Sequence, residues 1–84
     1  MGTKDNPGEF DCHAKALPNE ETFTLLARDP SAPALVRLWA GIRHMEVDSG
    51  KRPESDRKMV DEAQECAERM ELWRLANDGA WRKA

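Results

Sequence analysis

The feature that most constrains this fold is a pair of helical apolar patterns separated by a short turn. The first pattern, from about Ser31 to Val47, repeats apolar side chains at steps of three and four residues: Leu35, Leu38, Trp39, Ile42 and Met45. The second, from about Pro53 to Ala76, repeats Met59, Ala63, Cys66, Met70 and Trp73 at the same steps. The sequence therefore predicts two amphipathic helices and a mainly α fold.

The turn between the helices decides how they pack. The segment from Asp48 to Arg52 contains Gly50, and Pro53 follows it as a helix start, so the two helices are expected to form an antiparallel hairpin. A single hairpin cannot cover both faces of a core that includes Trp39, Leu35 and Ile42. We therefore expect two chains to pair as a helical bundle, with Met59, Cys66, Met70 and Trp73 as core positions.

The ends of the chain carry no regular apolar pattern. Residues 1–18 are polar and rich in Gly and Pro, which predicts a flexible arm. Residues 19–79 form the expected helical domain, and residues 80–84, with Trp81, form a tail. Thr22–Leu26 mixes strand-forming and helix-forming residues, so either a short strand or one helical turn fits there. A strand would have to pair with another, such as its copy in a second subunit.

The charge and the cysteine content indicate the redox environment of the chain and the kinds of partner that it can bind. The 84 residues carry 13 Lys and Arg against 16 Asp and Glu, a net charge of -3, which argues against general nucleic-acid binding. Cys12 and Cys66 are too few for a disulfide framework, which favours a reduced cytoplasm. We also expect neither a signal peptide nor a membrane span, because the chain has no long apolar run.

Residues with catalytic or metal-binding chemistry are scattered. Cys12 and His13 are adjacent ligands, but His44 and Cys66 lack the paired spacing of a zinc site. Consecutive Asp11, Cys12 and His13 cannot hold the geometry of a catalytic triad, and no glycine-rich phosphate loop is present. The sequence therefore predicts no enzyme activity, no metal and no cofactor.

Two groups of side chains are candidates for binding a ligand or partner. Arg37, Trp39 and Arg43 combine an aromatic ring with guanidinium groups, which suits a nucleotide or an acidic peptide. Glu20 and Arg28 bracket an apolar stretch, and Arg28 offers two parallel hydrogen bonds to a phosphate or carboxylate. The structural alternatives are that Trp39 is a core residue and that Arg28 pairs with a glutamate.

The segment from Pro18 to Ala40 resembles a group of small phage and prophage proteins. Their shared core reads Pro-Asp-Glu-Pro-x-Phe-x-Leu-x-Ala-x-Asp, followed by a helix that contains Trp. The matching positions are Pro18, Glu20, Phe23, Leu25, Ala27, Asp29, Ala32 and Trp39, whereas Asn19 and Glu21 depart from the motif. The group has no established function, so the resemblance implies a phage origin and no mechanism. Together with the absent catalytic set and the uncovered apolar helix faces, it leads us to expect a small, non-enzymatic, homodimeric protein of the host cytoplasm. Its expected role is to capture a host ligand, either a defence protein or a nucleotide signal; the alternative is an accessory protein of a phage assembly.

Overall fold

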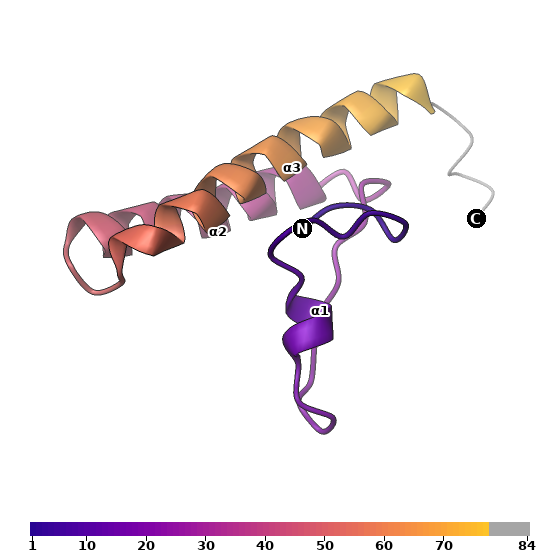
Figure 1. The fold of residues 1–84 in the computed structure, drawn as a ribbon. Coiled ribbons are helices and arrows are strands. Elements are labelled where there is room, and N and C mark those ends of the chain that lie inside the picture. Colours follow the sequence, from indigo (N-terminus) through magenta and orange to yellow (C-terminus); the bar gives the residue numbers. More distant parts are fainter. Residues whose placement is uncertain (78–84) are drawn as a thin grey trace.

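Two long helices lie side by side in a computed structural model that describes residues 1–77 (Figure 1). The elements are α1 (Cys12–Lys15), α2 (Ala32–Asp48), the 3-10 helix η1 (Glu54–Asp56) and α3 (Arg57–Ala76). Helices α2 and α3 run in opposite directions from the turn that joins them. The mainly α prediction is confirmed, and residues 1–77 contain no strand. Nor is any helix in this part of the chain long and apolar enough to cross a membrane.

Helix α2 begins and ends at the signals that the sequence carries. Pro33 occupies the first turn, where backbone donors have no partner inside the helix. The N-cap residue Ser31 makes no side-chain capping bond; instead, its backbone N–H donates to Oδ1 of Asp29 at 2.9 Å. After Asp48, Gly50 has a φ of 80° and its N–H donates to the carbonyl of Val47 at 3.1 Å, which terminates the helix.

Helix α3 starts one turn later than expected. Pro53 has an extended backbone and precedes η1, and the α-helical hydrogen bonding begins at Arg57. At the other end, the N–H of Asn77 donates to the carbonyl of Trp73 at 2.9 Å. Gly79, a residue type that commonly follows the end of a helix, and the tail with Trp81 lie outside the described residues.

Small side chains fill the interface between α2 and α3. The buried positions of the two helices are Ala32, Pro33, Ala40 and Val47 on α2, and Val60, Ala63, Cys66 and Ala67 on α3. Val60 is the largest side chain that is fully buried. Alanines let two helix backbones approach closely, so the larger apolar side chains are displaced to the edges of the contact. The core prediction is confirmed for Cys66, whereas Met59 and Met70 are half-buried. It is wrong for Trp73, which is 40% exposed.

A second apolar face of α2 points away from α3. Its members are 45 to 69% exposed: Leu35, Leu38, Ile42 and Met45. Because a helix turns by about 100° per residue, these four lie on the side opposite Ala40 and Val47. We call them the outer face of α2. Leu35 and Ile42 were expected in the core, and within one chain they are exposed.

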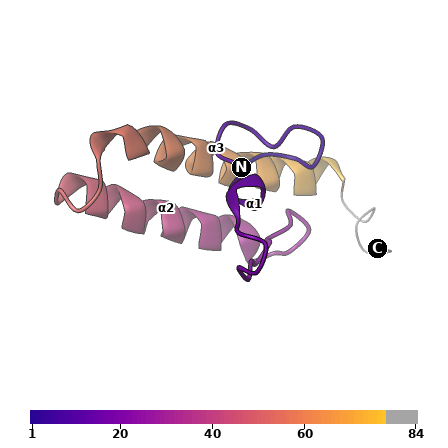
Figure 2. The same cartoon turned by 60° about the horizontal axis from the view of Figure 1, so that its bottom comes forward.

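The N-terminal segment lies over one side of the two helices (Figure 2). The amino group of Met1 forms an ion pair with Glu62 of α3 at 2.9 Å, and Met1 also packs against the cluster of Ala40, Val60 and Ala63. The short helix α1 has no buried residue. Thr22–Leu26, for which a strand and a helical turn were both open, belongs to neither.

Candidate functional site

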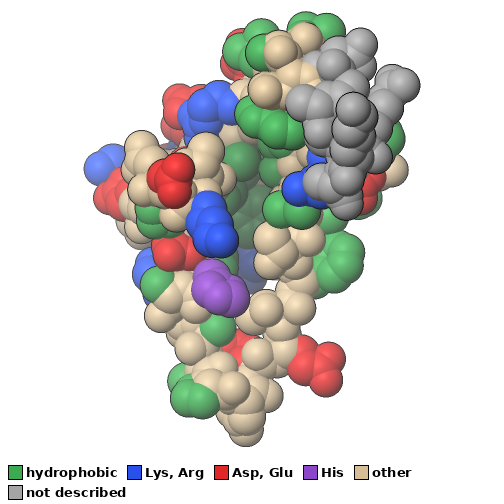
Figure 3. All heavy atoms as spheres, turned by 90° about the vertical axis from the view of Figure 1, so that its right-hand side faces the viewer, with side chains coloured by type: hydrophobic (Ala, Val, Ile, Leu, Met, Phe, Trp, Pro, Cys, Tyr) green, Lys and Arg blue, Asp and Glu red, His purple; other side chains and the backbone are tan. Residues whose placement is uncertain are grey.

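A pocket of about 600 Å³ lies between α3 and the segment that precedes α2. Its apolar lining comes from both elements: Leu25, Leu26 and Ala27, and Cys66, Met70, Leu72, Trp73 and Ala76. Gly2, Thr3 and Lys4 add a wall from the N-terminal segment. Figure 3 shows a hollow at this end of the molecule, with hydrophobic side chains at its base and Lys or Arg side chains on both sides. We call it the α3 pocket.

A long-range hydrogen bond positions the wall that precedes α2. The guanidinium of Arg74 on α3 donates to the backbone carbonyl of Arg28 at 2.6 Å and to that of Ala27 at 3.4 Å. These bonds hold an irregular segment against a helix that lies more than forty residues away in the chain. Arg74 therefore ties the segment that carries Leu25 and Leu26 to α3.

The pocket has a cationic rim. Lys4, Arg28 and Arg69 line it, and no Asp or Glu is among its described lining residues. Neither Lys4 nor Arg28 has a side-chain hydrogen bond or ion pair with another residue in 1–77. Arg69 has one ion pair, with Glu65 at 3.8 Å, and both side chains are more than half exposed. In a chain of net charge -3, this is a local excess of positive charge.

The five residues expected from the sequence to bind a ligand lie at different places. Arg28 lines the α3 pocket, and Glu20, Arg37, Trp39 and Arg43 do not. Oε1 of Glu20 accepts a hydrogen bond from the backbone N–H of Leu17 at 3.0 Å, which closes a local turn. Arg37 forms an ion pair with Glu71 of α3.

Trp39 and Arg43 form a separate pair on α2. The guanidinium of Arg43 lies 5.1 Å from the centre of the Trp39 ring, within the range of a cation–π interaction. Trp39 also packs against Ala40, Val60 and Ala63, so it contributes to the core as well. Arg37 precedes Trp39 by two residues, which places the two side chains about 200° apart around the helix. The structure therefore brings Trp39 together with Arg43 and separates both from Arg37.

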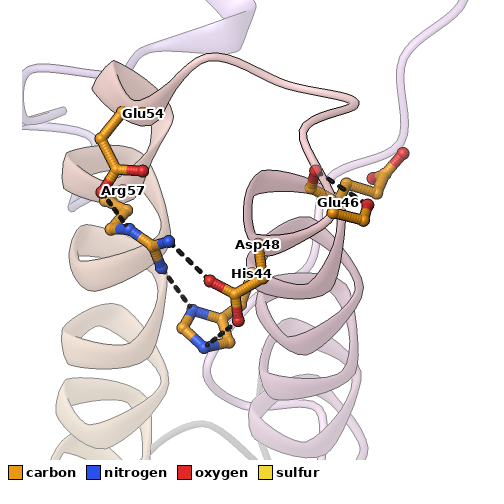
Figure 4. A network of polar contacts seen from close by, with 6 residues as sticks. His44, Glu46, Asp48, Glu54 and Arg57 are labelled. Carbon is orange, nitrogen blue, oxygen red and sulfur yellow. Dashed lines mark hydrogen bonds and ion pairs between the residues drawn. The ribbon is translucent and has the colours of Figure 1, made fainter.

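A polar network joins the ends of α2 and α3 at the turn (Figure 4). The guanidinium of Arg57 donates to Oδ1 of Asp48 at 2.6 Å, to Glu54 and to Nδ1 of His44 at 3.2 Å. Since an arginine can only donate, Nδ1 of His44 accepts, and its Nε2 faces Oδ2 of Asp48 at 3.3 Å. His44, Asp48, Glu54 and Arg57 therefore connect the two helix ends on either side of the turn.

Arg52, in the turn between the two helices, is also neutralised by ion pairs. Arg52 pairs with Glu46 at 3.3 Å and lies 3.9 Å from Asp56.

Residues 1–77 contain no group of three or more His, Cys, Asp or Glu side chains that could hold a metal ion. Cys12 is exposed and Cys66 is buried, and neither forms a disulfide.

The chain has no match among protein-family models, curated proteins or solved structures. Sequence reasoning identified Arg28 but missed Lys4, Arg69 and Trp73 as its neighbours in the pocket. Trp73 was assigned to the core because its spacing continues the apolar pattern of α3. Lys4 had no signal, because only the folded chain brings it to α3.

Proposed function

We propose that this chain is a small, non-enzymatic binding protein of phage type that forms a homodimer and captures a host ligand by occupancy. The host ligands expected from the sequence are a defence protein or a nucleotide signal. The host cytoplasm is the expected location. The single observation that carries the proposal is that α2 is apolar on two opposite faces, of which α3 covers one.

The outer face of α2 has the composition of a buried contact. Leu38 and Met45 are 61% and 69% exposed, which leaves a continuous apolar stripe in water. No charged residue stands between the four members of the stripe on that side of the helix, so covering it would bury no unpaired charge. A chain of this size has a thin core, and a second subunit would add to it.

A second copy of the chain fits this stripe by symmetry. Leu35, Leu38, Ile42 and Met45 are separated by three, four and three residues, a pattern that reads the same in both directions. Two antiparallel copies of α2 would place Leu38 opposite Ile42 of the partner subunit and Leu35 opposite Met45 of the partner subunit. Such a self-complementary contact is what a two-fold dimer requires, and it would complete a four-helix bundle.

The capture of a ligand is supported by the α3 pocket. None of its lining residues belongs to the outer face of α2, so the dimer contact and the pocket use different surfaces. The resemblance of Pro18–Ala40 to phage proteins supports a host ligand as the target.

Light scattering combined with a pull-down tests the proposal. The wild-type protein is expected to show twice the 9.5 kDa mass of the chain at micromolar concentration, and Leu38→Glu is expected to be monomeric. Leu75→Glu is the matched control, because Leu75 is 79% exposed but lies on α3. A monomeric wild type with a cooperative melt would contradict the dimer. A pull-down from host lysate, analysed for proteins and small molecules, identifies the captured ligand.

A second function is favoured by Phe23. This side chain is 86% exposed, and it lies in Thr22–Leu26, outside any helix or strand. Such a segment could add to the edge of a sheet in a phage assembly, with Phe23 as an anchor. Recovery of phage structural proteins alone, abolished by Phe23→Ala, would support this accessory role over capture of a host ligand.

A further inference from the structure

We propose that the α3 pocket binds a fatty acyl carboxylate, with the acyl chain along the apolar wall and the carboxylate at the cationic rim. The inference rests on the proposed capture of a ligand, and for the α3 pocket it replaces the nucleotide expected from the sequence with an acyl carboxylate. It is carried by three features of the described lining: its apolar side chains, two cations without an ion-pair partner in residues 1–77, and the presence of two uncharged polar side chains only.

The lining favours an aliphatic body. Leu25, Leu26, Met70 and Leu72 surround the pocket, and Trp73 adds a flat apolar surface. Leu26, Leu72 and Trp73 are 51%, 57% and 40% exposed, so a ligand would remove exposed apolar surface from water. A volume of about 600 Å³ lies within the range of pockets that hold small organic ligands.

The rim favours a negative charge at one end of the ligand. Lys4 and Arg28 have no hydrogen-bond or ion-pair partner inside residues 1–77, and Arg69 has one long ion pair at the surface. The planar guanidinium of Arg28 can bind both oxygens of one carboxylate. A cationic amphiphile would meet only like charges there, because the lining found in the described residues includes no acid.

The pocket is poorly suited to a nucleotide. A base and a ribose carry several polar groups, and each needs a partner when it leaves water. The uncharged polar side chains in the described lining are Thr3 and Asn77, and each already uses one hydrogen-bonding site inside the protein. Oγ1 of Thr3 accepts from the N–H of Asn6 at 2.9 Å, and Nδ2 of Asn77 donates to the carbonyl of Trp73 at 3.0 Å. An acyl chain has no polar groups and needs no hydrogen-bond partners in the pocket.

Isothermal titration calorimetry of the whole chain with sodium dodecanoate, below its micelle concentration, tests the proposal. We expect saturable binding of one dodecanoate per chain and no binding of dodecyltrimethylammonium, which has the same chain length and the opposite charge. Arg28→Gln should weaken dodecanoate binding about tenfold, through loss of a charge-assisted contact. Leu26→Ala should weaken it as well, whereas Lys58→Gln, at an exposed position outside the pocket, should not.

A further variant separates the pocket from the outer face of α2. Leu38→Glu should bind dodecanoate as tightly as the wild type, even though it is expected to be monomeric. The proposal is overturned if the two amphiphiles bind equally, if Arg28→Gln and Leu26→Ala leave binding unchanged, or if adenosine monophosphate binds and dodecanoate does not. Capture of another host ligand without dodecanoate binding would refute the acyl ligand and leave the proposed function standing.

Discussion

Arg57, the first residue of α3, places Nη2 of its guanidinium 2.6 Å from Oδ1 of Asp48, the last residue of α2. This ion pair spans the turn and fixes where one helix ends relative to where the next begins. The hydrogen bond from Arg57 is the main reason that the pKa of Asp48 lies below its ordinary value of 3.8; partial desolvation acts in the opposite direction, and the charge of Arg57 lowers the pKa further.

The Asp48 pair predicts a loss of stability in acid. Because the pKa of Asp48 is lowered by folding, its contribution to stability is present above pH 3.8 and is lost as the pH falls through the lower, folded pKa. Asp48→Asn should therefore lower the Tm near neutral pH and have little effect at about pH 2. Thermal melts across this range, with Asp61→Asn as an exposed control, measure the difference. If Asp48→Asn lowers the Tm by the same amount near neutral pH and at about pH 2, the ionised Asp48 carboxylate is not the source of the lost stability.

Replacing each of two glycines by alanine is expected to change the stability of the protein in opposite directions. Gly50 has a φ of 80°, a conformation that costs an L-residue about 1–2 kcal/mol, so Gly50→Ala should destabilise the protein by that amount. Gly41 lies inside α2, and a Cβ there would meet no atom within 4 Å. Gly41→Ala should stabilise by about 0.5–1 kcal/mol. Urea unfolding measures both, and a neutral Gly50→Ala would show that the turn relaxes.

The alanine-rich interface predicts that enlarged side chains are poorly tolerated. Ala67 is fully buried between α2 and α3, so Ala67→Leu should destabilise the fold by about 1–3 kcal/mol through overpacking. Gln64→Leu adds an apolar side chain at an exposed position of the same helix and serves as the control. If both variants melt at the same temperature, the helices are packed less closely than the structure describes.

The ion pair between Arg37 and Glu71 should contribute little to stability. Both side chains are about half exposed, at 48% and 50%, and such pairs typically contribute less than about 1 kcal/mol. Arg37→Gln, Glu71→Gln and the double variant form a thermodynamic cycle whose coupling energy isolates the pair. A coupling energy well above about 1 kcal/mol would mean that solvent screens the pair less than its exposure implies.

The local boundaries of the helices could be predicted from the sequence, because they depend on neighbouring residues. Pro33 at the start of α2 and Gly50 after its end act through their own backbone conformations. The apolar periodicity likewise predicted two helices within a few residues of their observed limits. The 3-10 turn at Glu54–Asp56 was missed, since it differs from an α-helix by one hydrogen-bond register. The short helix α1 at Cys12–Lys15 was missed as well, because the segment expected to be a flexible arm has no apolar periodicity.

Tertiary packing alone decided which apolar face of α2 is covered and where a pocket forms. Both sides of α2 are apolar, so periodicity could not show that α3 packs on Ala40 and Val47 and leaves Leu38 in water. The choice depends on the small side chains Ala63 and Ala67 of α3, which permit a close contact. The pocket depends on Arg74 bonding the backbone of Arg28, a contact between residues distant in the chain that no local pattern encodes.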